Sequence, residues 1–230
     1  MRWTAKRTSR RVLHMLKLYF SPMACSTASR IALDEAGAEA ELVEVDPKTK
    51  TILASGADFR ETNPLGYVPF LEDGALRIAE NAAILQHIAA KYPDAALAPT
   101  DPQGRAELQR WLSFISTELH KTLFAPLLDP NAPPVVKEYA VAKAESRLAW
   151  LDSQLTGRET LLARFSVADA YLVTVLSWTA VLPVTLRPET QRYLDGLRQR
   201  PSVARSIRTE YALYIAERAR HGRAPSEHHR

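Results

Sequence analysis

The segment LKLYFSPMACSTASRIALDEAG, residues 16–37, contains the signals of a strand, a break and a helix in immediate succession. Residues 16–20 alternate leucine or phenylalanine with other side chains, which is the period of a β-strand. Ser21-Pro22 interrupts the alternation, and apolar residues then recur at helical spacing over 28–36, with Gly37 as a C-terminal stop. The segment therefore predicts a strand that turns directly into a helix.

The residues that follow extend this unit into a mixed sheet. Residues 41–45 (ELVEV) are the next predicted strand, and a strand–helix–strand order places the two strands parallel. Apolar runs at 68–71 and 76–78 flank EDGA at 72–75, where Asp-Gly indicates a tight hairpin and hence an antiparallel pair. A helical pattern at 84–88 completes a small α/β domain.

The second half of the chain is predicted to be helical throughout. After a proline-containing connector at 94–102 no strand pattern recurs. SVAD at 166–169 has the form of a capping box and opens an apolar helix that we expect to end near Pro183. Apolar stripes at helical spacing mark the other helices, at 108–119, 148–155, 188–200 and 202–218. The expected fold class is α/β plus all-α.

With 230 residues, the chain is long enough for two small domains. We expect a basic extension at 1–14, an α/β domain at 15–93, a linker at 94–102, an all-helical domain at 103–219 and a polar tail at 220–230. The hydrophobic fraction of 46% and the charged fraction of 24% are ordinary for a globular protein. A single cysteine excludes a disulfide framework and a Cys-rich zinc module, and we expect no metal site.

The positive charge of the chain is concentrated at its start. Residues 1–14 hold five basic side chains and no acidic one, and without them the chain is close to neutral. We therefore expect no nucleic-acid partner. The segment 9–13 is weakly similar to a twin-arginine export signal, but a strand and turn follow it instead of an apolar stretch; the alternative is an upstream extension before a true start at Met15. The longest uncharged stretch, 170–186, is shorter than the ~20 residues of a membrane-spanning helix, so we expect no membrane association.

Cys25 lies where the first predicted strand turns into the first helix. Helix amides and the positive end of the helix dipole at such a position lower the pKa of a thiol. Ser26 beside it offers a hydroxyl that can hydrogen-bond a substrate thiolate. The ordinary alternatives are a small buried hydrophobic residue for Cys25 and a simple N-cap for Ser26.

Three further positions carry chemical signals. Val68-Pro69 at the start of a strand indicates an edge, a bulge or a cis peptide bond, and a cis bond would leave the Val68 backbone free to pair with an extended peptide. Glu80-Asn81 precedes a helix, where an acid beside a cap residue can hold the ammonium and carboxylate of an amino-acid-like ligand; both are also ordinary helix-start residues. His120 lies on the long helix and, taken alone, is more typical of a structural histidine.

Taken together, the sequence resembles a cytosolic glutathione S-transferase, specifically one of the bacterial beta class. The resemblance covers residues 15–217, and the start S-x-A-D-A-Y of one helix alone would support only the wider superfamily. The stretches that carry it are LKLYFSPMACSTASRIALDEAG, ELVEVDPKTK, NPLGYVPFLEDGALRIAENAAILQHIA, WLSFISTELHK and RFSVADAYLVTVLSW. It implies a thioredoxin-like N-terminal domain with a mixed sheet, an all-helical C-terminal domain, and a homodimer with the active site between the domains.

The resemblance also implies the residues of the active site. Cys25 matches the class cysteine, Ser26 its neighbouring serine, and His120 the histidine that the helical domain points at the thiol. Ser26, helix amides and His120 are then expected to stabilise negative charge on a bound sulfur.

Glutathione, the implied co-substrate, has its own set of matching residues. Val68-Pro69 matches the cis-proline dipeptide that pairs with the glutathione backbone. Glu80, with Asn81 beside it, matches the acid that binds the γ-glutamyl end. Lys50 matches a lysine that reaches the glycine carboxylate.

The sequence departs from the class at several positions. Asn81 stands where a small or hydroxylic residue is usual, and Ser113 replaces an asparagine that contacts the cysteine. Phe20 replaces a tyrosine, Phe70 replaces an alanine after the proline, and Ala163 replaces a glycine ahead of the capping box.

These observations lead to three hypotheses. The first is a cytoplasmic, detoxifying transferase that conjugates reduced glutathione to small hydrophobic electrophiles. The second is a glutathione-dependent thiol transferase or disulfide reductase that uses Cys25. The third is a non-catalytic glutathione-binding stress protein, which would bind glutathione or a partner without turnover.

Overall fold

The computed structural model describes residues 15–222, so the expectations for residues 1–14 and 223–230 fall outside it. Its N-terminal part contains a four-stranded sheet with the order β2-β1-β3-β4. The strands are β1 (Leu16–Phe20), β2 (Ala40–Glu44), β3 (Phe70–Asp73) and β4 (Leu76–Ala79). β1 runs parallel to β2 and antiparallel to β3, which confirms the predicted mixed sheet.

The tight hairpin between β3 and β4 follows the Asp-Gly signal. Asp73 pairs with Leu76, so the loop consists of Gly74 and Ala75 alone. Gly74 has a φ of 61°, a left-handed conformation that glycine adopts without a steric penalty. The loop therefore fixes the register that places Leu71 opposite Ile78 in the sheet.

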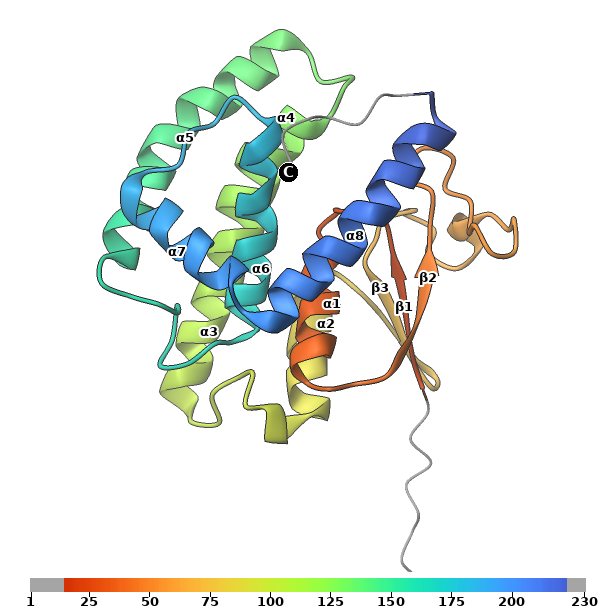
Figure 1. The fold of residues 1–230 in the computed structure, drawn as a ribbon, viewed down its shortest axis with the longest axis horizontal. Helices are drawn as coiled ribbons and strands as arrows, with labels where there is room; N and C mark the ends of the chain where they lie inside the picture. The colour runs from red at the N-terminus through yellow and green to blue at the C-terminus, as the bar shows by residue number, and fades with distance from the viewer. Residues whose placement is uncertain (1–14, 223–230) are drawn as a thin grey trace, which may run out of the picture.

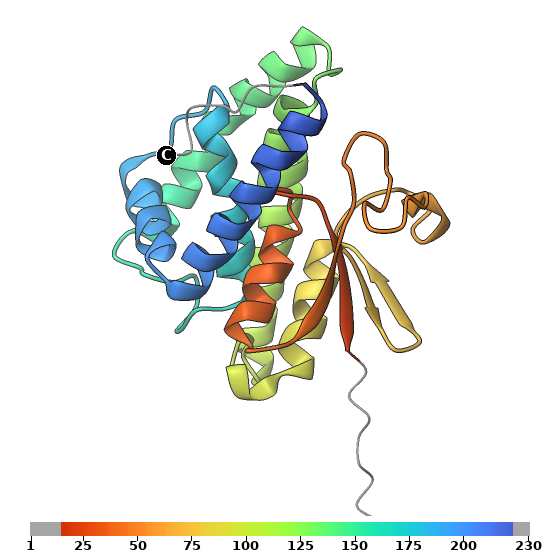
Figure 2. The same ribbon diagram turned by 45° about the vertical axis from the view of Figure 1, so that its right-hand side comes forward.

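Two helices cover one face of the sheet and separate it from the helical domain (Figures 1 and 2). These are α1 (Thr27–Glu35) and α2 (Asn81–Lys91). Leu18 in the middle of β1 and Ile31 on α1 are fully buried in the core that the sheet and the two helices share. Within the segment between β2 and β3, the short 3-10 helix η1 (Phe59–Glu61) lies on the side of the sheet away from the helical domain (Figure 2).

The rest of the described chain is helical, as predicted, and no strand follows β4 before residue 222. The helices are η2 (Pro93–Ala95), α3 (Pro102–Phe114), η3 (Ile115–Phe124), α4 (Ala125–Leu128), α5 (Pro134–Leu155), α6 (Val167–Ser177), η4 (Trp178–Val181), α7 (Pro188–Arg198) and α8 (Pro201–Arg220). α6 and α8 both pack against α1, so the two parts of the chain share one continuous core.

The apolar helix α6 forms as the capping box predicts, but it is shorter. The Ser166 amide donates to the Asp169 carboxylate at 2.8 Å, and every residue of α6 is buried. The helix ends at Ser177 and continues as the 3-10 helix η4, whereas the sequence pattern extends it to Pro183. Leu182 is extended because a following proline disfavours helical backbone in the residue before it. No helix within residues 15–222 is long and apolar enough to cross a membrane.

Two other helices differ from their predicted limits. The stripe over 108–119 predicts one regular helix, but α3 changes at Ile115 into η3, a π-helix. The stripe stays buried across the change, because it reports which side chains face the core and not which backbone groups are bonded. Arg220 and His221, at the start of the predicted tail, instead end α8 and contact the N-terminal domain.

Candidate functional site

A cavity opens between the β1–α1 turn, the segment before β3, the start of α2, and the helices η3 and α6. Both domains contribute to its walls. The predicted site residues that line it are Cys25, Val68, Pro69, Glu80, Asn81 and His120. Ser26 and Lys50 are not among its lining residues, and each is considered below.

The thiol of Cys25 is held in its protonated form. Its Sγ donates a hydrogen bond to the Val68 carbonyl oxygen at 3.4 Å. Burial raises the pKa of Cys25 to about 11, although the Lys121 ammonium and the backbone amides of Cys25 and Ser26 act in the opposite direction. The expectation of a lowered thiol pKa is therefore wrong, because desolvation of the thiolate outweighs the nearby ammonium and amides.

Ser26 does not face the cavity. Its side chain is fully buried, and its hydroxyl donates to the Ser21 carbonyl at 3.2 Å and accepts from the Ser21 amide at 3.3 Å. These bonds close the turn between β1 and α1. The structure thus places Ser26 behind the cysteine, as a support for the turn and outside the cavity lining.

The peptide bond between Val68 and Pro69 is cis. This selects one of the three alternatives that the sequence allowed for a proline at the start of a strand. Val68 and Cys25 both line the cavity, and the Val68 carbonyl accepts the hydrogen bond of the Cys25 thiol.

Glu80 and Asn81, at the start of α2, differ in burial and make different contacts. Glu80 is exposed and lines the cavity. The Asn81 side chain is buried; its Nδ2 donates to the Cys25 carbonyl at 3.1 Å and its Oδ1 accepts from the Ser29 hydroxyl at 2.9 Å. Asn81 therefore ties the start of α2 to the turn that carries the cysteine.

Strained backbone is concentrated around this site. Four non-glycine residues in the described chain have a positive φ, and three of them are Met23 (57°), Lys50 (62°) and Glu80 (69°). Such conformations cost on the order of 1 kcal/mol or more and cluster at functional sites. Here they fall on the turn before Cys25, on the predicted carboxylate-binding lysine and on the predicted γ-glutamyl-binding acid.

Lys50 lies just outside the cavity wall, next to an aromatic residue that belongs to it. Its Nζ is 5.7 Å from the centroid of the Tyr67 ring, and the Nζ of Lys121 is at the same distance from that ring. Tyr67 lines the cavity and is 64% exposed. Two ammonium groups therefore border one edge of the cavity, where they can attract a carboxylate.

His120 points from the π-helix η3 into the cavity. Its Nδ1 lies 2.7 Å from the hydroxyl of Tyr171, a buried residue of α6. Burial, assisted by the charge of Lys121, lowers the pKa of His120 to about 4. The imidazole is thus neutral at pH 7, and Nε2 is the ring nitrogen left for a ligand.

Ser113, which stands where the class has an asparagine that contacts the cysteine, makes no such contact here. Ser113 is exposed, and its hydroxyl accepts from Gln109 on the same helix at 3.2 Å. Ser116 lines the cavity instead. Its position four residues before His120 puts both side chains on one helical face, a spacing that would have identified it.

Tyr171 and Lys121 were also missed, although both lie in stretches that carry the resemblance. Tyr171 ends the S-x-A-D-A-Y motif and Lys121 follows His120. Tyr171 contacts His120 and Lys121 contacts Tyr67. Contacts between residues so far apart in the sequence leave no local pattern that could predict them. Within residues 15–222 no cluster of three metal-ligating side chains occurs.

Comparison with known proteins identifies the family. The sequence model of the glutathione S-transferase N-terminal domain matches residues 14–90. Over 201 residues the chain is 37% identical to glutathione S-transferase GstA of Escherichia coli O157:H7, with 85% of this chain and 98% of the relative covered. The chain belongs to the glutathione S-transferase family.

Solved structures of bacterial transferases share the whole fold with this glutathione S-transferase. A ternary complex of BphK, a bacterial enzyme of the family, is 41% identical with a TM-score of 0.80. A sphingomonad transferase in complex with glutathione is 39% identical, with a TM-score of 0.79. The beta-class transferase of Sphingomonas chungbukensis is 40% identical, again with a TM-score of 0.79. Each match covers 84% of this chain and 98% of the other, and the transferase is thus of the bacterial beta class, with a thioredoxin-like domain followed by a helical one.

Proposed function

We propose that this protein conjugates reduced glutathione to small hydrophobic electrophiles. The observation that carries the proposal is the cavity between the two domains, where Cys25, Val68 and Glu80 of one domain face His120 of the other. Relatives of about 40% identity include a transferase with glutathione bound, which supports the same ligand here.

The charges and backbone groups around the cavity suit the tripeptide. Glu80 supplies a carboxylate for the ammonium of the γ-glutamyl end, and the start of α2 offers helix amides for its carboxylate. The backbone of Val68 pairs with the cysteinyl residue. Lys50 binds the glycine carboxylate, which leaves the glutathione sulfur near Cys25 and His120.

The chemical step ionises the thiol of glutathione. Its proton leaves to solvent, since the pKa of about 4 makes His120 a weak proton acceptor. The thiolate is stabilised by the Cys25 thiol, the neutral His120 imidazole and the Lys121 ammonium. The sulfur then forms a bond with the electrophilic carbon, and the leaving group departs with its electron pair. No oxidation or reduction takes place.

The thiol transferase alternative is less well supported. Thiol–disulfide exchange through the protein needs the thiolate of Cys25, and burial raises the pKa of that thiol to about 11. Conjugation needs only the thiolate of glutathione.

We further propose that the protein is a homodimer and acts in the cytoplasm. Leu65 and Tyr67, at the edge of the cavity, are 67% and 64% exposed, and such apolar surface suits a second subunit or a hydrophobic electrophile. A free cysteine and a substrate that must be reduced fit a reducing compartment.

Parallel assays of the purified full chain test these proposals. We expect glutathione-dependent conjugation of 1-chloro-2,4-dinitrobenzene, followed by absorbance, and little reduction of a glutathione mixed disulfide. Glu80→Gln should raise the KM for glutathione about tenfold with a smaller change in kcat, since it removes a charge-assisted contact.

Glutathione binding without turnover of any electrophile would favour the stress-protein hypothesis. Light scattering of the purified full chain measures the oligomeric state and so tests the proposed homodimer.

A further inference from the structure

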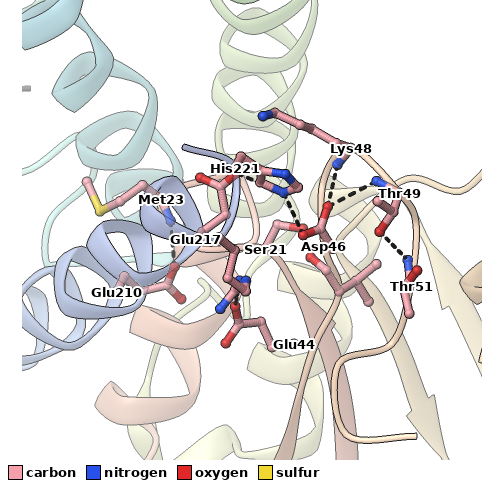
Figure 3. Close-up of polar contacts among 12 residues, drawn as sticks. Ser21, Met23, Glu44, Asp46, Lys48, Thr49, Thr51, Glu210, Glu217 and His221 are labelled. Atoms are coloured by element: carbon pink, nitrogen blue, oxygen red, sulfur yellow. Dashed lines mark hydrogen bonds and ion pairs between the residues drawn. The ribbon is translucent and has the colours of Figure 1, made fainter. Parts of the chain in front are cut away.

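The last helix of the helical domain ends against the glutathione-binding domain. α8 runs along α1 and finishes beside the loop that follows β2 (Figure 1). There the imidazole of His221 points at the carboxylate of Asp46, with Nε2 2.7 Å from Oδ2 (Figure 3). Both side chains are largely buried, with exposed fractions of 16% and 5%. This contact joins residues 175 positions apart in the sequence.

Asp46 is the residue that shapes this loop. Its Oδ1 accepts from the backbone amides of Lys48 at 2.9 Å and Thr49 at 3.0 Å (Figure 3). Its own carbonyl accepts from the amide of Lys50 at 3.0 Å. One carboxylate oxygen therefore folds the turn, while the other is held by His221.

The turn ends at Lys50, whose backbone conformation is strained. Lys50 has a φ of 62°, which a non-glycine residue keeps only when its surroundings enforce it. Two surrounding contacts are backbone bonds, from the Lys50 amide to Asp46 and from the Phe59 amide to the Lys50 carbonyl. A change in the position of the Asp46 side chain would therefore shift the backbone turn and, with it, the backbone of Lys50.

Two further contacts at the end of α8 lie next to this pair. Glu217, one turn earlier, places its Oε1 3.6 Å from the same imidazole nitrogen, and Arg220 donates to Glu44 at 2.6 Å. Burial raises the pKa of Asp46, but the amides of Thr49 and Lys48 and the His221 imidazole lower it by more. The carboxylate is therefore ionised at neutral pH and able to hold both the turn and the imidazole.

We propose that His221 is a positioning residue for glutathione: through Asp46 it fixes the turn that presents Lys50 to the glycine carboxylate. The inference rests on the proposed function, because it assigns Lys50 to that carboxylate. It makes the C-terminal end of the helical domain a determinant of glutathione affinity, at a distance from the reacting sulfur.

The test compares two ligands that differ only at the glycine end. Glutathione and γ-glutamylcysteine, which lacks the glycine residue, are titrated calorimetrically into the full-length wild type and variants. Lys50→Ala should weaken glutathione about tenfold, the scale of a charged hydrogen bond. His221→Ala should weaken it about threefold to fivefold, the scale of one hydrogen bond between largely buried groups. Neither should change the affinity for γ-glutamylcysteine.

Three further variants make the result specific. His221→Gln, whose amide can still donate to Asp46, should recover most of the affinity. Arg220→Ala removes the neighbouring contact to Glu44 and should bind both ligands like the wild type. His221→Ala combined with Lys50→Ala should bind glutathione no more weakly than Lys50→Ala alone.

The outcomes separate the two proposals. A wild type that binds neither ligand overturns the proposed function, and the inference with it. A wild type and a Lys50→Ala variant that behave as expected, beside a His221→Ala variant that binds glutathione like the wild type, overturn the inference alone. Equal weakening of both ligands by His221→Ala also overturns it, since the effect would then be a general loss of structure.

Discussion

Nδ1 of His120 and the hydroxyl oxygen of Tyr171 lie 2.7 Å apart, across the contact between the π-helix η3 and helix α6. Their rings meet edge to face, with centroids 5.9 Å apart at 87°. Burial raises the pKa of Tyr171, so its hydroxyl stays protonated, while the pKa of His120 is lowered to about 4. Both groups are thus neutral at pH 7. By holding Nδ1, the tyrosine hydroxyl orients the imidazole so that Nε2 is the nitrogen turned to the cavity.

Tyr171→Phe should separate this orientation from the chemistry itself. The variant keeps the ring and its packing but removes the partner of Nδ1. We expect kcat for conjugation to fall about tenfold in Tyr171→Phe and on the order of a hundredfold in His120→Ala, with a small change in the KM for glutathione. Steady-state kinetics measure both, and wild-type kcat in Tyr171→Phe would show that the hydroxyl does not orient the imidazole.

The raised pKa of Cys25 predicts a slow and strongly pH-dependent thiol. Alkylation by iodoacetamide requires the thiolate, so its rate should rise about tenfold per pH unit from pH 7 towards the pKa of about 11. Lys121→Gln should slow the reaction at every pH, because the ammonium lowers that pKa. Mass spectrometry follows the modification, with Cys25→Ala as the unreactive control. A rate that levels off near pH 8 would contradict the buried-thiol interpretation.

Replacing the cysteine distinguishes conjugation from exchange. Cys25→Ala removes the protein sulfur but leaves His120, Lys121 and the helix amides in place. We expect most of the conjugation activity to remain, whereas a mixed disulfide with oxidised glutathione can no longer form. Intact-mass measurement detects that adduct in the wild type. Equal loss of both activities in Cys25→Ala would move the assignment to the thiol transferase hypothesis.

Most of the fold is encoded in short-range patterns. The alternation at 16–20, the Asp-Gly hairpin and the Ser166–Asp169 capping box are each complete within a few residues, and the structure contains all three. The change from α3 to a π-helix at Ile115 has no such signal. It alters which backbone amide meets which carbonyl without changing the stripe of apolar side chains.

Which residues form the site could largely be predicted from the sequence, but the pKa shifts of those residues could not. The positions of Cys25 and His120 follow from the resemblance, and both line the cavity. A local argument from the helix dipole gives the wrong direction for the pKa of Cys25, because the burial that raises it comes from tertiary packing. The place of Ser26 outside the cavity lining has a similar cause, because its hydroxyl bonds to Ser21 inside the turn.

A buried carboxylate on α8 holds the turn that carries the cysteine. Glu210 is fully buried, and its Oε2 accepts from the Met23 amide at 2.8 Å and from the Thr27 hydroxyl at 3.2 Å. Its Oε1 lies 3.6 Å from a guanidinium nitrogen of Arg30. Burial nevertheless raises the pKa of Glu210 to about 7, so the folded protein retains a proton there that the unfolded chain releases near pH 4.5.

Glu210→Gln should therefore change how stability depends on pH. In the wild type, the contribution of the protonated carboxyl is full below pH 4.5 and is lost as the pH rises through about 7. Glutamine keeps an acceptor for Met23 and Thr27 and does not titrate, so the variant should gain on the order of 2 kcal/mol relative to the wild type between pH 5 and pH 8. The lowered pKa of His120 acts in the opposite sense below pH 6.5, but it is common to both proteins and cancels in the difference. Urea unfolding at four pH values measures this difference, with Glu138→Gln on the exposed side of α5 as the control; parallel curves for Glu210→Gln and the wild type would contradict the prediction.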